Sequence, residues 1–426
     1  MKQLLALLLL VAAALPAQAT LEITITGGDE SAQPIAVVPF RGLESVSLDV
    51  AKVVENDLAR TGLFKPLARE SMLEKPFDIS QVNYANWRAV NADSVVLGQL
   101  ATGAGGTIGA RFFLVDSVRQ QQLLGYDMPP VQPGQVRYLA HQIADLIFEK
   151  LTGIRGAFNT RIAYIAATGL GYARRYELVV ADADGENPRP VATSREPLMS
   201  PAWSPDRKQL AYVGYERGRS AIYVQNLETG QVKKLVSEKG INGSPAWSPD
   251  GRSLAITLSF ESNPDIYVVD VASGNRRRIT DHYGIDTEAA WSPDGQELVF
   301  TSDRGGTPQI YRVPVAGGTP ERLTFQGVQN LRASYSPDGK KLCLVNSDAG
   351  RYRIALLDLA THDINTITDG GLDESPQFAP NGAVIIYATQ GGGTAELATV
   401  SLDGRVRTRL RQAGDVREPA WSPFTR

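Results

Sequence analysis

The chain has 426 residues, a formal net charge of −3 and a charged fraction of 21%. Because Lys and Arg are not gathered into a basic stripe, we expect neither a nucleic-acid groove nor an electrostatic membrane patch. The single cysteine, Cys343, cannot form an internal disulfide, and we expect it to be a core thiol.

Residues 1–19 have the order of a secretory signal peptide. Lys2 precedes an apolar run from Leu4 to Leu15, and the small residues Ala17 and Ala19 then form a cleavage site. The apolar run is too short to span a bilayer. We therefore expect residues 1–19 to be removed, and a soluble product with no direct membrane insertion.

The next segment, residues 20–33, begins with a short alternating pattern. Apolar Leu21, Ile23 and Ile25 alternate with polar residues, and the Gly-Gly pair at 27–28 ends the alternation. Such a segment can form a detachable edge strand that adds to a partner's sheet. It can also be a permanently paired edge strand of the domain that follows, and both interpretations stay open at this point.

Residues 34–155 are expected to form a small α/β domain. Apolar residues at helical spacing, as at Ala140, Ile143 and Ile147, indicate helices, and Gly62 is expected to end the first of them. The predicted helices span residues 48–61, 84–90 and 135–151. The predicted strands span residues 34–40, 94–100, 108–115 and 122–126.

The remainder of the chain, residues 161–426, repeats an aromatic-Ser-Pro-Asp-Gly phrase. The aromatic positions are Trp203, Trp247, Trp291, Tyr335, Phe378 and Trp421. They follow one another at steps of 44, 44, 44, 43 and 43 residues by subtraction, and a period of about 40–50 residues with strand-like sequence between the marks is typical of a β-propeller. Each period holds the four strands of one blade, with Ser-Pro-Asp-Gly at a hairpin corner. We expect each aromatic residue to end the innermost strand and to pack between neighbouring blades.

The two ends of the repeat region are expected to complete one blade. The first period starts at Ile162 without a strand that ends in the repeated aromatic residue, and it supplies only three strands through Val191. At the other end, Trp421 ends a strand that no further blade follows. Pairing these pieces leaves no free sheet edge. The predicted fold class is an α/β N-terminal domain followed by an all-β six-bladed β-propeller, with the ring closed by the C-terminal strand.

Patterns of catalytic or metal-binding residues are not found. The three histidines, His141, His282 and His362, have no companion at ligand spacing, and we expect all three at the surface. The stretch from Asp182 to Gly185 lacks the further ligands of a calcium loop and is predicted to be a hairpin turn. We therefore expect no catalytic residue, no metal and no cofactor.

The order of these parts resembles the TolB family of periplasmic proteins, which belongs to the Tol-Pal system of Gram-negative bacteria. The resemblance covers the whole chain and includes the phrases at Pro34–Phe40, Gly243–Trp247, Leu372–Pro376 and Glu418–Pro423. The blade phrase alone is weaker, because propellers of prolyl-oligopeptidase-type enzymes carry similar repeats. The order of the domains decides for the TolB family.

The resemblance implies a monomeric periplasmic binding module rather than an enzyme. Its implied partners are TolA, which is anchored in the inner membrane and takes the mature N-terminal segment, and the peptidoglycan-associated lipoprotein Pal, which takes a face of the propeller. Colicins are considered as further ligands of that face. The implied TolA-binding residues are Thr20, Leu21, Glu22, Ile23, Thr24, Ile25, Thr26, Gly27, Gly28, Asp29, Glu30 and Ser31.

The implied Pal-binding residues lie in the variable loops before the innermost strands, opposite the Ser-Pro-Asp-Gly corners. The family's contact positions correspond to Ile241, Ser244 and Thr287. Ile241 departs from the family, in which this position often carries His. The neighbours expected to supply hydrogen bonds at the rim, with loop capping as their alternative role, are Asn242, Asp286, Glu288, Arg332, Asp373 and Glu374.

The family also implies a switch, in which Pal binding favours a docked N-terminal strand and Pal release exposes that strand to TolA. Such a module would support outer-membrane integrity and invagination during cell division. Two other classes remain as alternatives, another periplasmic ligand-binding or sensor propeller, and a propeller enzyme. The enzyme would need an appended hydrolase domain or a converging set of His, Arg and metal ligands.

Overall fold

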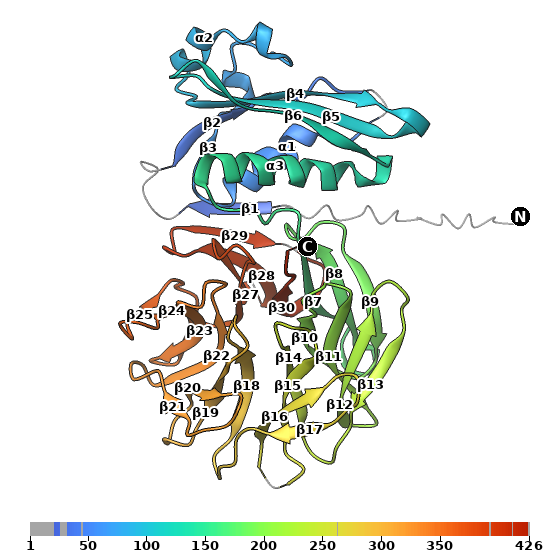
Figure 1. The fold of residues 1–426 in the computed structure, drawn as a ribbon, viewed down its shortest axis with the longest axis vertical. Helices are drawn as coiled ribbons and strands as arrows, with labels where there is room; N and C mark the ends of the chain where they lie inside the picture. Colours follow the sequence, from blue (N-terminus) through green and yellow to red (C-terminus); the bar gives the residue numbers. More distant parts are fainter. Residues whose placement is uncertain are drawn as a thin grey trace, which may run out of the picture.

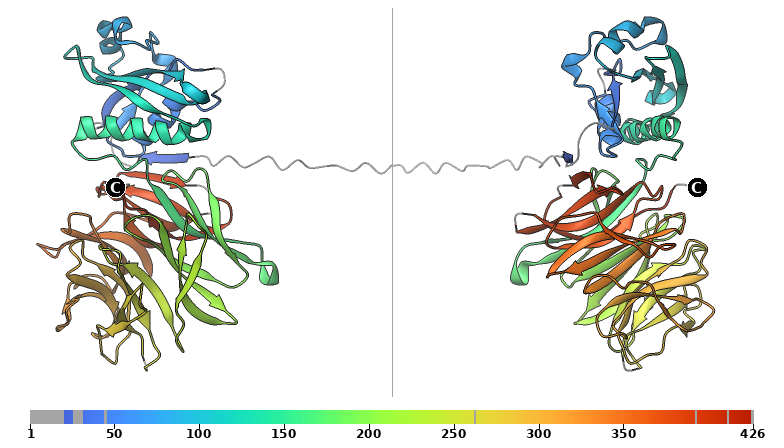
Figure 2. Two further views of the ribbon diagram at one scale, coloured as in Figure 1. Left: turned by 45° about the vertical axis from the view of Figure 1, so that its right-hand side comes forward. Right: turned by 90° about the vertical axis from the view of Figure 1, so that its left-hand side faces the viewer.

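The computed structural model describes residues 21–25, 32–43, 46–261, 263–391, 393–410 and 412–424. The predicted signal peptide at residues 1–19, Thr20 and the stretch Thr26–Ser31 lie outside these residues. The α/β domain is stacked on the propeller along the long axis of the molecule, and strand β1 (Leu21–Ile25) lies between the two (Figures 1 and 2). Within the described residues, no helix is both long and apolar enough to cross a lipid bilayer.

The α/β domain contains one five-stranded sheet in the order β3–β2–β4–β5–β6. Strand β2 pairs in parallel with β3 and β4, whereas β5 and β6 continue the sheet in antiparallel fashion. The strands are β2 (Gln33–Val37), β3 (Phe64–Pro66), β4 (Ser94–Thr102), β5 (Ile108–Asp116) and β6 (Gln121–Val131). The helices are α1 (Val50–Ala59), α2 (Tyr84–Ala89) and α3 (Val136–Thr152). Every predicted helix and strand of the domain is present, and β6 is longer than predicted.

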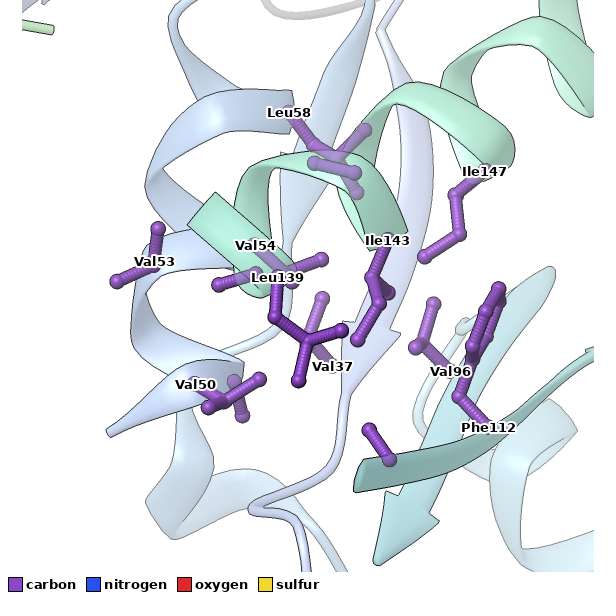
Figure 3. Packing of buried hydrophobic residues seen from close by; sticks show 14 of the residues in the cluster. Val37, Val50, Val53, Val54, Leu58, Val96, Phe112, Leu139, Ile143 and Ile147 are labelled. Carbon is purple, nitrogen blue, oxygen red and sulfur yellow. The ribbon is translucent and has the colours of Figure 1, made fainter. Parts of the chain in front are cut away.

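Helices α1 and α3 form the main core of this domain with one face of the sheet. Val54 and Leu58 of α1 and Ile143 of α3 point toward Val37 and Phe112 of the sheet (Figure 3), and all five side chains are buried. Burying one such side chain contributes roughly 1.5–3 kcal/mol. The apolar spacing seen in the sequence therefore fixes which face of each helix packs inward.

The propeller consists of six blades in the described part of the chain, each a four-stranded antiparallel sheet to which β1 adds a fifth strand in blade 6. From the innermost strand outward, blade 1 is β30 (Asp415–Trp421), β7 (Arg161–Thr168), β8 (Arg175–Asp182) and β9 (Arg189–Ser194). Blade 2 is β10 (Leu198–Trp203), β11 (Gln209–Glu216), β12 (Arg219–Asn226) and β13 (Val232–Val236). Blade 3 is β14 (Asn242–Trp247), β15 (Ser253–Leu258), β16 (Asp265–Asp270) and β17 (Arg276–Arg278).

Blades 4 to 6 complete the ring. Blade 4 is β18 (Asp286–Trp291), β19 (Glu297–Ser302), β20 (Gln309–Pro314) and β21 (Glu321–Arg322). Blade 5 is β22 (Gln329–Tyr335), β23 (Lys341–Asp348), β24 (Arg351–Asp358) and β25 (Ile364–Thr366). Blade 6 is β26 (Asp373–Phe378), β27 (Val384–Gly391), β28 (Thr394–Ser401) and β29 (Val406–Leu410).

Ring closure occurs as predicted. Strand β30 pairs antiparallel with β7, with Asp415 opposite Ala167 and Trp421 opposite Ile162. The indole Nε1 of Trp421 donates a hydrogen bond of 2.7 Å to the hydroxyl of Thr160, just before β7. The last strand of the chain thus becomes the innermost strand of the first blade, which confirms the predicted fold class.

Three of the repeated aromatic residues, Trp203, Trp247 and Trp291, also join successive blades through hydrogen bonds. The indole Nε1 of Trp247 donates to the carbonyl of Ala202 at 3.2 Å, and that of Trp291 donates to Ala246 at 2.9 Å. Trp247 packs against buried residues of blades 2 and 3, which confirms the predicted position between neighbouring blades. A tryptophan at this position thereby supplies both apolar area and a polar contact across the blade boundary.

The prediction of surface positions is wrong for His141, whereas His362 is exposed and His282 is half-buried. The His141 side chain on α3 is only 2% exposed. The reason is long-range: the predicted turn between β8 and β9 is present, and it lies against α3 so that Asp184 covers the histidine. Cys343 is fully buried, as predicted.

Candidate functional site: the channel mouth and the N-terminal strand

Six equivalent residues, one from each blade, line a cavity of about 130 Å³ at the centre of the ring. Each lies three residues before the repeated aromatic position and sits at a break in the register between the innermost strand and the next one. The residues are Ser200, Ser244, Glu288, Arg332, Ser375 and Glu418, called the channel ring below. The bulges turn these side chains out of the sheet pattern and toward the channel.

All six residues of the channel ring have a left-handed backbone. Their φ angles lie between +48° at Ser244 and +57° at Glu288 and Ser375. For a residue with a side chain this conformation costs on the order of 1–2 kcal/mol. The repetition of the same unfavourable conformation in all six blades indicates that the blade geometry imposes it.

Three charged members of the channel ring interact with one another. Arg332 pairs with Glu418 at 3.1 Å and lies 3.9 Å from Glu288. Burial works against the charge of the guanidinium, but the carboxylates of Glu418, Glu288 and Glu374 outweigh it and raise the pKa of Arg332. Two carboxylates and one guanidinium give the ring a formal charge of −1, so the channel mouth is polar and slightly acidic.

The family's three contact positions lie around this mouth. Ile241 is 50% exposed in the loop before β14, whereas Ser244 is half-buried in the channel ring. Thr287 is half-buried, with its hydroxyl 3.3 Å from that of Thr257. Among the neighbours, Glu374 is half-buried next to Ser375. The structure thus brings these residues to one region, and Ile241 is the most exposed of the four.

Three other predicted rim residues are buried at the base of the loops. Asn242 is 1% exposed, and its side-chain amide donates to the carbonyls of Ser220 and Glu238 at 3.1 and 2.8 Å. Asp286 accepts a hydrogen bond from Arg304 at 2.6 Å, and Asp373 accepts one from Thr389 at 2.6 Å. Their side chains hold the loops in shape, which is the capping role that the sequence left open.

Sequence reasoning missed an apolar collar on the same loops. The loops that lead into β14, β18, β22 and β26 expose large hydrophobic side chains. The collar consists of Ile241 (50% exposed), Tyr283 (84%), Ile285 (48%), Phe325 (67%), Val328 (53%) and Leu372 (37%). Exposed apolar patches on a protein surface often take part in binding. The sequence does contain this feature, because apolar residues occupy loop positions that the packing of the blades does not require to be apolar.

The N-terminal strand β1 pairs with the propeller rather than with the α/β domain. It lies antiparallel to β29, with Leu21 opposite Leu410, Glu22 opposite Arg409 and Ile25 opposite Val406. The alternation in the sequence correctly predicted an edge strand, and of the two interpretations left open, permanent pairing with the small domain is not what the structure has. The implied TolA-binding residues Thr20 and Thr26–Ser31 lie outside the described residues.

Two family models match the chain. One is described as the TolB amino-terminal domain and matches residues 21–123, and the other is described as the TolB beta propeller domain and matches residues 148–425. The Tol-Pal system protein TolB of Methylococcus capsulatus is 60% identical over 416 residues, which cover 97% of either chain. The protein of the same name from Thioalkalivibrio sulfidiphilus is 59% identical over 424 residues, covering 98% of this chain and 97% of the relative. The crystal structure of TolB from Acinetobacter baumannii, at 42% identity, superposes with a TM-score of 0.89 and covers 96% of this chain and 100% of that chain.

The left-handed backbone of the channel ring predicts opposite effects for two substitutions at Ser375, which is 5% exposed. Ser375→Gly relieves the strain and should raise the free energy of unfolding by about 0.5–1 kcal/mol, whereas Ser375→Val should lower it by about 1–2 kcal/mol. Urea denaturation measures both. The matched control is Ser347→Gly, because Ser347 is equally buried but has an ordinary backbone, and this change should be destabilising. Equal losses for the two glycine variants would show that the ring is not strained.

Proposed function

Because the chain belongs to the TolB family of the Tol-Pal system, we propose that it is a periplasmic interaction module that links TolA to the lipoprotein Pal. In this role it supports outer-membrane integrity and invagination during cell division. The resemblance seen in the sequence is confirmed by the family models and relatives. The observation that carries the proposal is the combination of an apolar collar around a polar channel with an added edge strand on blade 6.

The proposed binding surface for Pal is the channel mouth. The collar would supply apolar contacts, and the channel ring, with Ser244, Glu288 and Arg332, would supply hydrogen bonds to an inserted segment of the partner. Aromatic and apolar side chains that become buried in an interface often contribute most of the binding energy. Asn242, Asp286 and Asp373 would act indirectly by holding the loops, whereas Ile241, Thr287 and Glu374 would contact the partner.

The proposed binding segment for TolA is residues 20–31, of which β1 is the described part. A peptide that adds a strand to a sheet gains affinity from main-chain hydrogen bonds. When β1 is docked on β29, its main-chain groups already form hydrogen bonds within the chain. TolA can therefore capture the segment only when β1 leaves blade 6.

The two proposed surfaces lie on opposite faces of the propeller. The channel mouth is formed by loops that lead into the innermost strands, whereas the α/β domain contacts the other face. There, Asn381 in the β26–β27 corner donates to the carbonyl of Arg155 at 3.1 Å. Arg137 of α3 pairs with Asp184 in the β8–β9 turn on the same face.

Blade 6 reaches both surfaces. Its innermost strand carries Glu374 and Ser375 at the channel, and its outermost strand, β29, holds β1. A shift of this one sheet upon Pal binding would change the pairing of β1, which gives the proposed switch a physical route. If Pal favours the docked strand, Pal and TolA must weaken each other's binding by the same factor.

The proposed Pal surface predicts a loss of affinity in Ile241→Arg. An unpaired guanidinium buried in the collar should weaken binding of purified Pal by about 2 kcal/mol, or roughly 30-fold. The matched control is Val232→Arg on β13, because Val232 is also 50% exposed but lies away from the mouth. Calorimetric titration of both variants measures the effect. Equal affinity for Pal in the two variants would place the site elsewhere.

The docked strand predicts that a reversible lock blocks TolA. Glu22 and Arg409 are direct partners across the β1–β29 pair, so cysteines at both positions can form a disulfide that holds β1 in place. The oxidised Glu22→Cys, Arg409→Cys variant should lose TolA binding by about 100-fold or more, and reduction should restore it. The buried Cys343 cannot interfere because it is fully inaccessible.

The matched controls for the lock are the two single-cysteine variants, whose TolA binding should not respond to oxidation. Pal binding by the oxidised double variant shows that the propeller remains folded. Undiminished capture of TolA by the oxidised double variant would contradict the assignment of the segment.

A further inference from the structure

A buried group of charged side chains joins the α/β domain to the propeller. The imidazole of His141 on α3 is 2% exposed, with Nδ1 2.6 Å from Oδ2 of Asp57 on α1. Its other nitrogen, Nε2, lies 3.8 Å from Oδ2 of Asp184 in the β8–β9 turn of blade 1. The ring therefore stands between two carboxylates, one from each domain.

Arginines complete this junction cluster. Arg60 of α1 lies 3.2 Å from Asp57, and Arg137 of α3 pairs with Asp184 and lies 3.7 Å from Asp182. Asp57, His141 and Asp184 are close enough to hold a metal ion. We do not assign them as metal ligands, because both carboxylates are already neutralised by arginine side chains.

The geometry favours a protonated imidazole. A neutral ring that donates Nδ1–H to Asp57 would turn the lone pair of Nε2 toward the carboxylate of Asp184, and the opposite tautomer would place a lone pair 2.6 Å from Asp57. Nε2 forms no hydrogen bond among the described residues, so Asp184 acts on the ring through its charge at 3.8 Å. The carboxylates of Asp57, Asp182 and Asp184 outnumber the guanidinium groups of Arg60 and Arg137, and Asp145 and Glu186 lie close enough to interact with them, so a charged ring reduces the excess of negative charge in the cluster.

We propose that His141 is a proton-dependent latch between the α/β domain and the propeller: its imidazolium bridges Asp57 and Asp184, and loss of the proton weakens the docking of the two domains. This inference concerns the chain alone and does not rest on the identity of any partner. It has a consequence for the N-terminal strand, since β1 lies between the same two domains (Figure 1). Conditions that loosen the junction would also make β1 easier to release.

The direction of the pH dependence follows from the surroundings of His141. Burial and the nearby charge of Arg60 both lower the pKa of His141. The carboxylates of Asp57 and Asp184 outweigh these two effects and raise the pKa of His141 above its ordinary value. Undocking removes Asp184 but leaves Asp57 beside the ring, so only the part of the elevation that Asp184 causes is linked to docking. The resulting stabilisation of the docked state is complete below the pKa of the undocked ring, and it is lost as the pH rises through the higher pKa of the docked ring. Each unit by which the docked pKa exceeds the undocked one corresponds to a ten-fold change in the docking constant.

Other carboxyl groups at the junction titrate in the same direction and need a control. Burial raises the pKa of Asp145 on α3 to about 7, although its side chain accepts hydrogen bonds from the backbone of Phe158 and Asn159. Burial likewise raises the pKa of Asp182, whereas His141 and Arg137 outweigh burial and lower the pKa of Asp184. The test must therefore follow the histidine itself.

The first measurement is an NMR titration of the imidazole signals in the mature chain. The sequence has three histidines, so His282→Gln and His362→Gln assign the remaining signal to His141. We expect His141 to titrate above 6.5, the ordinary histidine value. Titration at or below that value would overturn the proposal, and this readout does not depend on a variant at His141.

The second measurement is the distance between spin labels on the two domains from pH 6 to 9. Cysteines at Val118 and Val232, which are 59% and 50% exposed, take the labels, and the inaccessible Cys343 stays unlabelled. We expect the distance distribution to broaden as the pH passes the pKa of His141. His141→Gln should remove this dependence, and the matched control His282→Gln should keep it, as should Asp145→Asn.

A distance distribution that does not change with pH, or one that changes equally in His141→Gln, would overturn the latch. Loss of the dependence in Asp145→Asn with retention in His141→Gln would assign the effect to Asp145 and would also overturn it. Pal and TolA binding play no part in either measurement, so a failed latch and a failed partner assignment are distinguished.

Discussion

The pairing of β30 with β7 is the contact on which the rest of the structure depends. It joins residues more than 240 positions apart and covers the inner edge of β7, which would otherwise lack a partner strand. Hydrogen bonds from Trp203, Trp247 and Trp291 to the preceding blade then fix the rotation between these blades. Only in the closed ring do six separate bulges face one axis, so the binding channel is a property of the ring and not of any blade.

The first and last blades have a second role, because the α/β domain and β1 contact the propeller there. Gly62 shows how close this contact is: a Cβ at this position would lie 2.1 Å from Cγ2 of Val406 on β29. The same strand pairs with β1, and blade 1 supplies Asp184 to the junction cluster. A single region of the molecule therefore combines the closure of the ring, the docking of the small domain and the position of the N-terminal strand. In the proposed switch, blade 6 connects the channel to this region.

Much of the fold could be predicted because local sequence patterns specify it. Turn chemistry, strand alternation and a regular aromatic residue specify a blade, and counting the blades yields the ring. The channel ring was only partly found, since Ser244, Glu288 and Arg332 were named but Ser200, Ser375 and Glu418 were not. Their common place three residues before the aromatic position was visible, but their left-handed backbone arises from the bulge, which local propensity does not reveal.

His141 was misplaced for a different reason. Its burial depends on Asp57 and Asp184, which lie 84 residues before and 43 residues after it by subtraction and meet it only in the docked structure. The strand that pairs with β1 could not be predicted either, because an alternating pattern predicts an edge strand but not the sheet to which it adds.

The central claim is that one propeller couples a partner on its channel mouth to the release of its own N-terminal strand on the other face. The most direct test is calorimetric titration of the mature chain with Pal and with a TolA fragment, first separately and then each in the presence of the other. The account predicts that each partner raises the dissociation constant of the other, and by the same factor in both directions. Independent binding of the two partners, or tighter binding of one in the presence of the other, would contradict it.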